Sequence, residues 1–184
     1  MGRYIVGVTG ASGSIYADRL LIHLRKLGQE SHLVFTETAK KVCAYEGFPE
    51  MAARADHVYD NKDFFAPFAS GSFRHDGMAV LPCSMGSLAK IAHGIGDSLL
   101  TRAADVCLKE KRRLIIVPRE TPMSALHLQN QKSLADFGAV IIPANPAFYH
   151  KPASIEDLVD TVLARVLDHL GLEDHDVGKR WREM

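Results

Sequence analysis

The sequence has no excess of charge of either sign, no paired cysteine motif and no long hydrophobic run. Lys plus Arg and Asp plus Glu both number 22 in 184 residues, so neither a nucleic-acid-binding surface nor an acidic tail is indicated. Cys43, Cys83 and Cys107 form no CxxC pair, which argues against a disulfide framework and a zinc site. No apolar stretch approaches the roughly 20 residues that span a bilayer, and no basic segment precedes an apolar run at the N-terminus. We therefore expect a soluble, cytoplasmic protein with no nucleic-acid or membrane partner.

Short apolar runs alternate along the chain with stretches long enough for helices. The runs lie at 4–9, 32–36, 78–82, 114–118 and 140–143, and the helical stretches at 15–27, 37–46, 87–109 and 122–137. This alternation predicts one α/β domain over 1–184, a Rossmann-like three-layer αβα fold around a parallel sheet. A last helix should begin after Ser154 and end at Gly171. A charged arm from about 172 to 184 should follow it, with Trp181 packed on a neighbouring subunit.

Small residues from Thr9 to Ser14 form a turn between the first strand and the first helix. Backbone N–H groups at such a helix start attract phosphate, so the turn predicts phosphate or cofactor binding. A nicotinamide site would need an acidic residue after the second strand to hold a ribose hydroxyl. That strand ends instead at Thr36, which suits a phosphate or a flavin ring, and the chain has no Tyr-x-x-x-Lys pair. A dehydrogenase is therefore disfavoured.

Two further turns carry polar residues at the carboxyl ends of predicted strands, where parallel sheets bind ligands. The segment from Pro82 to Ser87 offers amides and hydroxyls, although an ordinary serine helix cap explains it equally well. Cys83 within it is expected to be a buried packing residue, because no base lies nearby in the sequence. Arg119 and Glu120 directly follow an apolar strand and are flanked by two prolines, which favours a functional role over simple solvation.

Several cations, a tyrosine and hydroxyl groups are expected around one edge of the sheet. Arginine forks chelate phosphate oxygens, so this set suits a phosphate monoester beside any cofactor phosphate. No acidic cluster and no His, Cys and Asp set has metal-ligand spacing, and we expect protein cations to hold the phosphate without a metal. The cations are Arg102, Lys109, Arg119 and Arg165.

Several motifs follow one another in order between residues 3 and 170. They are Thr9-Gly-Ala-Ser-Gly13, Ala69-Ser-Gly-Ser72, Pro82-Cys-Ser84, Arg102-Ala-Ala-Asp-Val106, Leu108-Lys-Glu110, Val117-Pro-Arg-Glu-Thr-Pro122, Gly138-Ala-Val-Ile141 and Pro146-Ala-Phe-Tyr-His150. This ordered set resembles the UbiX/Pad family of flavin prenyltransferases. The resemblance implies a transferase that joins a dimethylallyl group, from dimethylallyl phosphate, to N5 and C6 of reduced FMN without a metal. The product, prenylated FMN, would serve UbiD-type decarboxylases, and the enzyme would be a homododecamer with active sites where subunits meet.

The resemblance also implies roles for individual residues. Ser12 and Glu46 would handle protons near flavin N5, Glu120 would act as acid or base in ring formation, and Lys109 is the fourth catalytic candidate. Gly86-Ser87 departs from the Lys-Thr of many relatives, and Phe64 stands where some relatives have Trp, so that its ring could stack on the allylic cation. The implied flavin contacts are Gly10, Ala11, Ser12, Thr36, Ser84, Met85, Gly86, Ser87 and Arg119. The implied isoprenoid-phosphate contacts are Ser70, Arg102, Lys109, Arg119, Glu120, Tyr149 and Arg165.

Two other functions stay open from the sequence. A related flavin-dependent cysteine decarboxylase would carry Pro-x-Met-Asn where this chain has Pro118-Arg119-Glu120-Thr121, and a helical active-site histidine near its start. A non-catalytic flavin carrier would need no second phosphate site, so the presence of Arg119-Glu120 with Lys109 and Arg165 argues against it.

Overall fold

A six-stranded parallel sheet organises the computed structural model, which describes residues 1–178. The spatial order is β3-β2-β1-β4-β5-β6. Strands β2 and β3 are thus added on one side of β1, and β4 to β6 on its other side, so the strand order reverses between β1 and β4. Near-continuous Val, Ile and Leu in the central strands is typical of parallel strands buried on both faces. The strands are β1 (Arg3–Val8), β2 (Glu30–Phe35), β3 (His57–Asp60), β4 (Gly77–Cys83), β5 (Arg113–Pro118) and β6 (Val140–Ile141).

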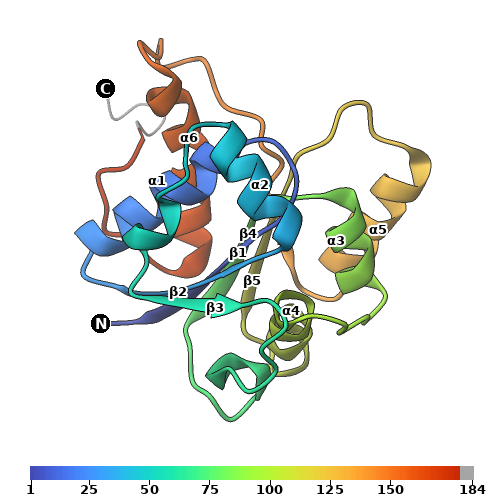
Figure 1. Cartoon of the computed structure of the whole chain (residues 1–184). Coiled ribbons are helices and arrows are strands. Elements are labelled where there is room, and N and C mark those ends of the chain that lie inside the picture. The colour runs from blue at the N-terminus through green and yellow to red at the C-terminus, as the bar shows by residue number, and fades with distance from the viewer. Residues whose placement is uncertain (179–184) are drawn as a thin grey trace.

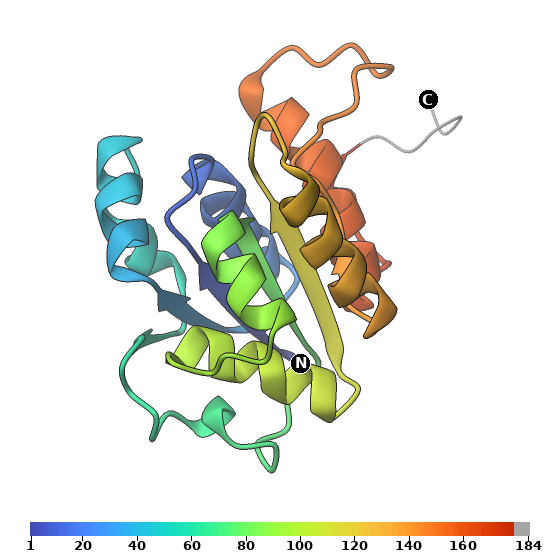
Figure 2. The same ribbon diagram turned by 90° about the vertical axis from the view of Figure 1, so that its right-hand side faces the viewer.

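Within residues 1–178, six α-helices cover the two faces of the sheet (Figure 1), and the turned view shows the same two layers (Figure 2). One face carries α1, α2 and α6, and the other carries α3, α4 and α5. The helices are α1 (Ser14–Lys26), α2 (Glu37–Tyr45), α3 (Met85–Ala92), α4 (Leu99–Lys109), α5 (Ala125–Asp136) and α6 (Ile155–Leu170), with short 3-10 helices η1 (Met51–Arg54) and η2 (Pro67–Ala69).

Alternate residues of β1, β2, β4 and β5 divide between two hydrophobic cores. In β1, Tyr4, Val6 and Val8 pack beneath α1 and α6, whereas Ile5 packs with Leu100 and the other α4 residues. Gly7 faces α4 as well, because a Cβ there would lie 3.2 Å from the Leu100 side chain. This division follows the two-residue period of a strand and fixes the sheet between its helix layers.

The predicted αβα architecture is confirmed, with differences in detail. β3 was not predicted, and the stretch 87–109 contains two helices because Gly94 to Ser98 interrupts it. The last helix is capped by Ser154 and ends at Gly171, whose φ of 83° suits glycine, as expected. Trp181 lies outside the described residues. Within residues 1–178 we find no helix with the length and apolar character needed to cross a membrane.

Candidate functional site

A cleft of about 460 Å³ lies at the carboxyl edge of the sheet, where β1, β2 and β4 end. Five of the nine predicted flavin contacts line it, although they come from three separate turns of the chain. The remaining lining comes from residues that the sequence did not single out. The predicted members are Gly10, Thr36, Ser84, Gly86 and Ser87; the others are Thr38, Asn61, Lys62, Lys90, Asp97, Ser98, Leu100 and Thr101.

Three helices begin at this cleft, each with a hydroxyl residue as its N-cap. Thr36 caps α2, Ser84 caps α3 and Ser98 caps α4, and each side chain accepts a backbone N–H three residues later. The first N–H groups of a helix have no partner within the helix, and its dipole places partial positive charge there. Convergence of these helix starts makes the cleft suitable for an anion such as a phosphate. The segment from Pro82 to Ser87 therefore provides both an ordinary helix cap, at Ser84, and part of the cleft lining. The two interpretations of this segment that the sequence left open do not exclude each other.

The end of β1 is tied to the end of β4 beneath this cleft. The Thr9 hydroxyl donates to the Pro82 carbonyl at 2.8 Å and accepts the Ser84 N–H at 2.7 Å. Gly10 then passes so close to α2 that a Cβ would lie 2.5 Å from Thr38 Cγ2, which explains the need for glycine. Gly86, by contrast, faces open space, because a Cβ at this position would have no atom of the described residues within 4 Å beyond its own helix turn.

Glu46 has partners that the sequence did not reveal. Its carboxylate accepts N–H bonds from Gly13 at 3.1 Å and Ser14 at 2.7 Å, at the start of α1. Burial alone would raise the pKa of Glu46, but hydrogen bonds from Ser12, Ser14 and these amides outweigh it and lower the pKa. The amides predicted to attract phosphate at the first turn thus hold a carboxylate at Gly13 and Ser14. Ser12, Glu46 and the start of α1 form one hydrogen-bonded group. The joint role of Ser12 and Glu46 in proton handling stays a prediction.

Arg119 joins this group rather than the cleft lining. Its Nε donates to the Ser12 carbonyl at 3.1 Å. Ser12 is exposed, whereas Ala11 and Met85 are buried, so these two can offer backbone groups but little side-chain surface. The flavin contacts expected of Ala11, Ser12, Met85 and Arg119 stay predictions.

Ser70, Arg102 and Lys109 lie together where the turn after η2 packs against α4. Arg102 Nε donates to the Ala69 carbonyl at 3.1 Å and its Nη1 pairs with Asp105 at 2.8 Å. Lys109 pairs with Glu110, and its amine lies 2.8 Å from where a Gly71 Cβ would stand. The turn after η2 therefore folds against α4, and three of the predicted phosphate contacts share one surface.

The expectation of one edge for all the cations is wrong within a single chain. Lys109 precedes the start of β5 at Arg113, whereas Arg119 follows its end at Pro118. At about 3.3 Å per residue, β5 separates the two residues by about 20 Å. The two side chains also bond in different directions, toward Glu110 and toward Ser12. As they are oriented in one chain, the two side chains therefore do not converge on one phosphate.

The remaining predicted residues lie at the surface. Glu120 follows β5, Tyr149 precedes α6 and Arg165 lies on it, whereas Phe64 lies in the loop after β3. Glu120 is half-buried and its Oε1 accepts the Thr121 N–H at 3.0 Å. Arg165 pairs with Asp168 at 2.7 Å on α6, as expected of an arginine beside a buried stripe. Tyr149 and Phe64 are both 46% exposed. These side chains are accessible to a ligand or to a second chain.

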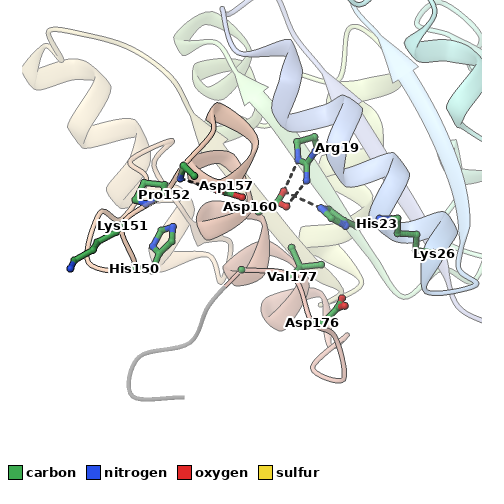
Figure 3. A pocket seen from close by; sticks show the side chains of 12 residues that line it. Arg19, His23, Lys26, His150, Lys151, Pro152, Asp157, Asp160, Asp176 and Val177 are labelled. Carbon is green, nitrogen blue, oxygen red and sulfur yellow. Dashed lines mark hydrogen bonds and ion pairs between the residues drawn. The ribbon is translucent and has the colours of Figure 1, made fainter. Parts of the chain in front are cut away.

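A second cavity, of about 430 Å³, lies between α1 and α6 (Figure 3). Its centre is occupied by an ion-pair network in which Asp160 accepts from Arg19 Nε at 2.7 Å and contacts His23 Nε2 at 3.0 Å. Burial acts to raise the pKa of Asp160, but the bonds from His23 and Arg19 lower it to about 2. This network links two helices on one face of the sheet and is structural. None of the predicted site residues, all of which lie within the described part of the chain, lines this cavity.

Cys83 is a packing residue, as expected. It is fully buried beside the cleft, and burial raises the pKa of its thiol to about 12. A thiol with this pKa is protonated at neutral pH and is a poor nucleophile.

Comparisons with known proteins show the family to which the chain is related. Residues 2–167 match the family model described as Flavoprotein. The chain is similar to the flavin prenyltransferase UbiX of Thermoplasma acidophilum, with 48% identity over 97% of this chain and 99% of the relative. It is also similar to the crystal structure of AnUbiX (PadA1) in complex with FMN and dimethylallyl pyrophosphate, with a TM-score of 0.94 and 46% identity over 100% of this chain and 98% of that one. A dodecameric FMN-dependent UbiX-like decarboxylase from Escherichia coli O157:H7 gives a TM-score of 0.94 and 46% identity, covering 98% and 99% of the two chains.

Proposed function

We propose that this chain, which belongs to the flavoprotein family and within it to the UbiX flavin prenyltransferases, makes prenylated FMN. Enzymes of this group are transferases. In this reaction the dimethylallyl group of dimethylallyl phosphate is joined to N5 and C6 of reduced FMN. The observation that supports this most is the cleft in which five predicted flavin contacts meet, in a chain 46% identical to a protein whose structure holds FMN and dimethylallyl pyrophosphate. We further propose a cytoplasmic enzyme whose product is received by a UbiD-type decarboxylase.

The cleft fits FMN in size and in chemistry. Its volume of about 460 Å³ lies in the range of small-molecule sites, and three helix starts with hydroxyl caps suit the ribityl phosphate. Lys90 and Lys62 add positive charge, part of which Asp97 neutralises through an ion pair with Lys90 at 2.6 Å. When bound, reduced FMN supplies the electron-rich atoms that attack the allylic carbon. The protein orients it and excludes water.

The isoprenoid phosphate is held by residues from different copies of the chain. Because Lys109 and Arg119 lie about 20 Å apart along β5, the group Ser70, Arg102 and Lys109 of one copy must face Arg119, Glu120, Tyr149 and Arg165 of another. Cations on two sides of the phosphate stabilise the charge that develops as it leaves, and they need no metal ion. Phe65 is 99% exposed and Phe148 is 68% exposed, and exposed aromatic side chains of this size support contact with other copies of the chain. By similarity to the Escherichia coli protein, the homo-oligomer is a dodecamer.

Proton transfer is assigned to the group beside Arg119 and to Glu120. The lowered pKa of Glu46 keeps this carboxylate ionised at neutral pH, so it acts as an acceptor and orients the Ser12 hydroxyl toward the flavin. Glu120, half-buried beside Arg119, would take the proton that leaves flavin C6 as the second bond closes the new ring. The double bond of the dimethylallyl group would gain a proton in the same step, which balances the proton lost from N5 when the first bond forms and the phosphate leaves.

Anaerobic incubation with reduced FMN and dimethylallyl phosphate tests the proposal. Mass spectrometry of the flavin should show the gain of one five-carbon unit, and dimethylallyl diphosphate in a parallel reaction establishes which phosphate is preferred. A flavin carrier, the alternative function, would bind FMN and return it unchanged in both reactions. A cysteine decarboxylase would leave the flavin unmodified and would release carbon dioxide from a peptide with a C-terminal cysteine.

A further inference from the structure

Three side chains gather at the outer edge of the sheet, at the end of the strands opposite the flavin cleft. Glu30 and His32 lie on β2, and His57 lies on β3, directly opposite His32 in the strand register. No motif in the sequence indicates this group, because 25 residues separate His32 from His57 and no metal-ligand spacing is present. Parallel pairing of β2 with β3, the strand missed in the sequence, brings them together (Figure 1).

The ligand atoms of this group converge on one point. Glu30 Oε1 lies 3.2 Å from His32 Nε2 and 3.1 Å from His57 Nε2, and all three atoms lie within 4.8 Å of one another. In a tetrahedral zinc site with bonds of about 2.0–2.1 Å, neighbouring ligand atoms are about 3.3 Å apart. The two oxygen–nitrogen distances therefore already match the edges of a zinc tetrahedron. Half-exposed His57 can rotate to bring the two histidine nitrogens closer.

His32 Nε2 has no hydrogen-bond partner among residues 1–178, although it is buried and faces a carboxylate oxygen. The other ring nitrogen, Nδ1, lies 3.0 Å from the Tyr59 hydroxyl. When Nδ1 carries the proton and donates it to Tyr59, the lone pair of Nε2 points at the negative oxygen of Glu30. Buried polar atoms normally have a hydrogen-bond partner, so the unpartnered His32 Nε2 facing Glu30 Oε1 favours a cation bound between these two atoms. Fixing one histidine nitrogen so that the other binds metal is also the usual outer-shell arrangement of metal sites.

We propose that Glu30, His32 and His57 bind a divalent transition-metal ion, with zinc the best match, and that the ion fastens β3 to β2. Two imidazoles and one carboxylate suit zinc better than magnesium or calcium, which prefer oxygen ligands. Solvent reaches the fourth position because the side chain of His57 is 48% exposed. Arg3 bonds the other oxygen of Glu30 at 3.1 Å; it orients the carboxylate but its charge weakens cation binding.

The site is separate from the prenyl-transfer reaction. Glu30 begins β2, whereas the cleft lies beyond the carboxyl end of the same strand, at Thr36. Metal removal should therefore leave FMN binding and turnover unchanged, and should weaken only the attachment of the edge strand. This proposal stands or falls independently of the proposed function.

Zinc titration of the untagged, chelator-treated protein tests the site. Calorimetry should give one zinc ion per chain, and Co²⁺ should produce the visible absorption of a tetrahedral complex. At 100 times its Kd, zinc should raise Tm by about 5–10 °C, the shift expected from mass action for a protein of this size. His57→Ala and Glu30→Gln should each weaken zinc binding by at least about 10-fold, whereas His169→Ala, at an exposed histidine on α6, should not change it.

Two results would overturn the proposal. One is zinc binding of equal strength in wild type and His57→Ala, which would place the ion elsewhere. The other is the absence of any saturable binding to folded wild-type protein. The second variant guards against misfolding, because Glu30→Gln keeps the size of the side chain and the Tm of the metal-free variant can be compared directly with wild type.

Discussion

Mixing two impaired variants should restore activity if the active site is shared between chains. Lys109→Ala and Arg119→Ala each remove one cation from the proposed phosphate site. Loss of a charged hydrogen bond costs about 1.5–3 kcal/mol, which predicts a fall in kcat/KM of about 10- to 150-fold for each variant alone. The two residues lie at opposite ends of β5, about 20 Å apart in one chain.

The expected recovery follows from random assembly. When the two variants are co-expressed in equal amounts, about one quarter of sites pair an intact Lys109 from one chain with an intact Arg119 from another. Activity per site should therefore rise to about 25% of wild type. If both residues served a site within one chain, every site would keep one defect and the mixture would be no more active than its components.

A matched pair serves as the control for this experiment. Arg102 and Lys109 lie on one surface of the same chain, so Arg102→Ala mixed with Lys109→Ala should regain nothing. Turnover of dimethylallyl phosphate is measured on the purified mixed oligomers, with the ratio of the two chains checked by mass spectrometry. Recovery in the control mixture, or none in the test mixture, would refute the shared site.

Three further predictions concern stability, the cleft and the chemistry. Asp160→Asn should lower the free energy of unfolding at pH 7 by about 1.5–3 kcal/mol, because Arg19 and His23 lose a charged acceptor. The pKa of Asp160 is lowered to about 2 in the folded state, so its contribution to the free energy of unfolding is complete above about pH 4 and is lost as the pH falls toward 2. Denaturant unfolding at several pH values should therefore show that the stability difference between variant and wild type vanishes at the acid end. Gly86→Lys should fold normally, because the position faces open space, and the added charge should tighten FMN binding by about 2- to 10-fold. Fluorescence titration at low and high salt measures this affinity, and weaker binding would place the flavin elsewhere. Glu120→Gln should keep FMN affinity within about 2-fold but slow closure of the fourth ring by about 10²- to 10⁴-fold, and normal ring closure in single-turnover absorbance traces would remove Glu120 from that step.

The arrangement of strands and helices could be predicted because apolar periodicity is strong in the buried core. β1 and β5 are continuous apolar runs, and α6 has a serine cap, acidic residues in its first turn and a glycine stop. β3 escaped prediction because three of its four residues are exposed, so it shows no hydrophobic pattern. The division of 87–109 could have been inferred, since Gly94 and Gly96 stand before Ser98, a good helix cap.

The candidate site could be predicted only where a turn directly follows a strand. Thr36 and Ser84 were found in this way, whereas Asn61 and Lys90 line the same cleft from a loop and a helix that carry no motif. The partners of Glu46 depend on how α2 packs near α1, which no spacing in the sequence reveals. The prediction that Lys109 lies at the same edge as Arg119 was wrong because it ignored the direction in which the chain runs. A helix that leads into a strand ends at the edge of the sheet where that strand begins, which is opposite its carboxyl end.

The structure of the flavin product decides whether this chain is a prenyltransferase. Reduced FMN and ¹³C-labelled dimethylallyl phosphate are incubated anaerobically with the enzyme, and the flavin is analysed by NMR. We predict that the labelled five-carbon unit is bonded to the flavin at both N5 and C6. Recovery of unchanged FMN with intact dimethylallyl phosphate would contradict the proposed reaction.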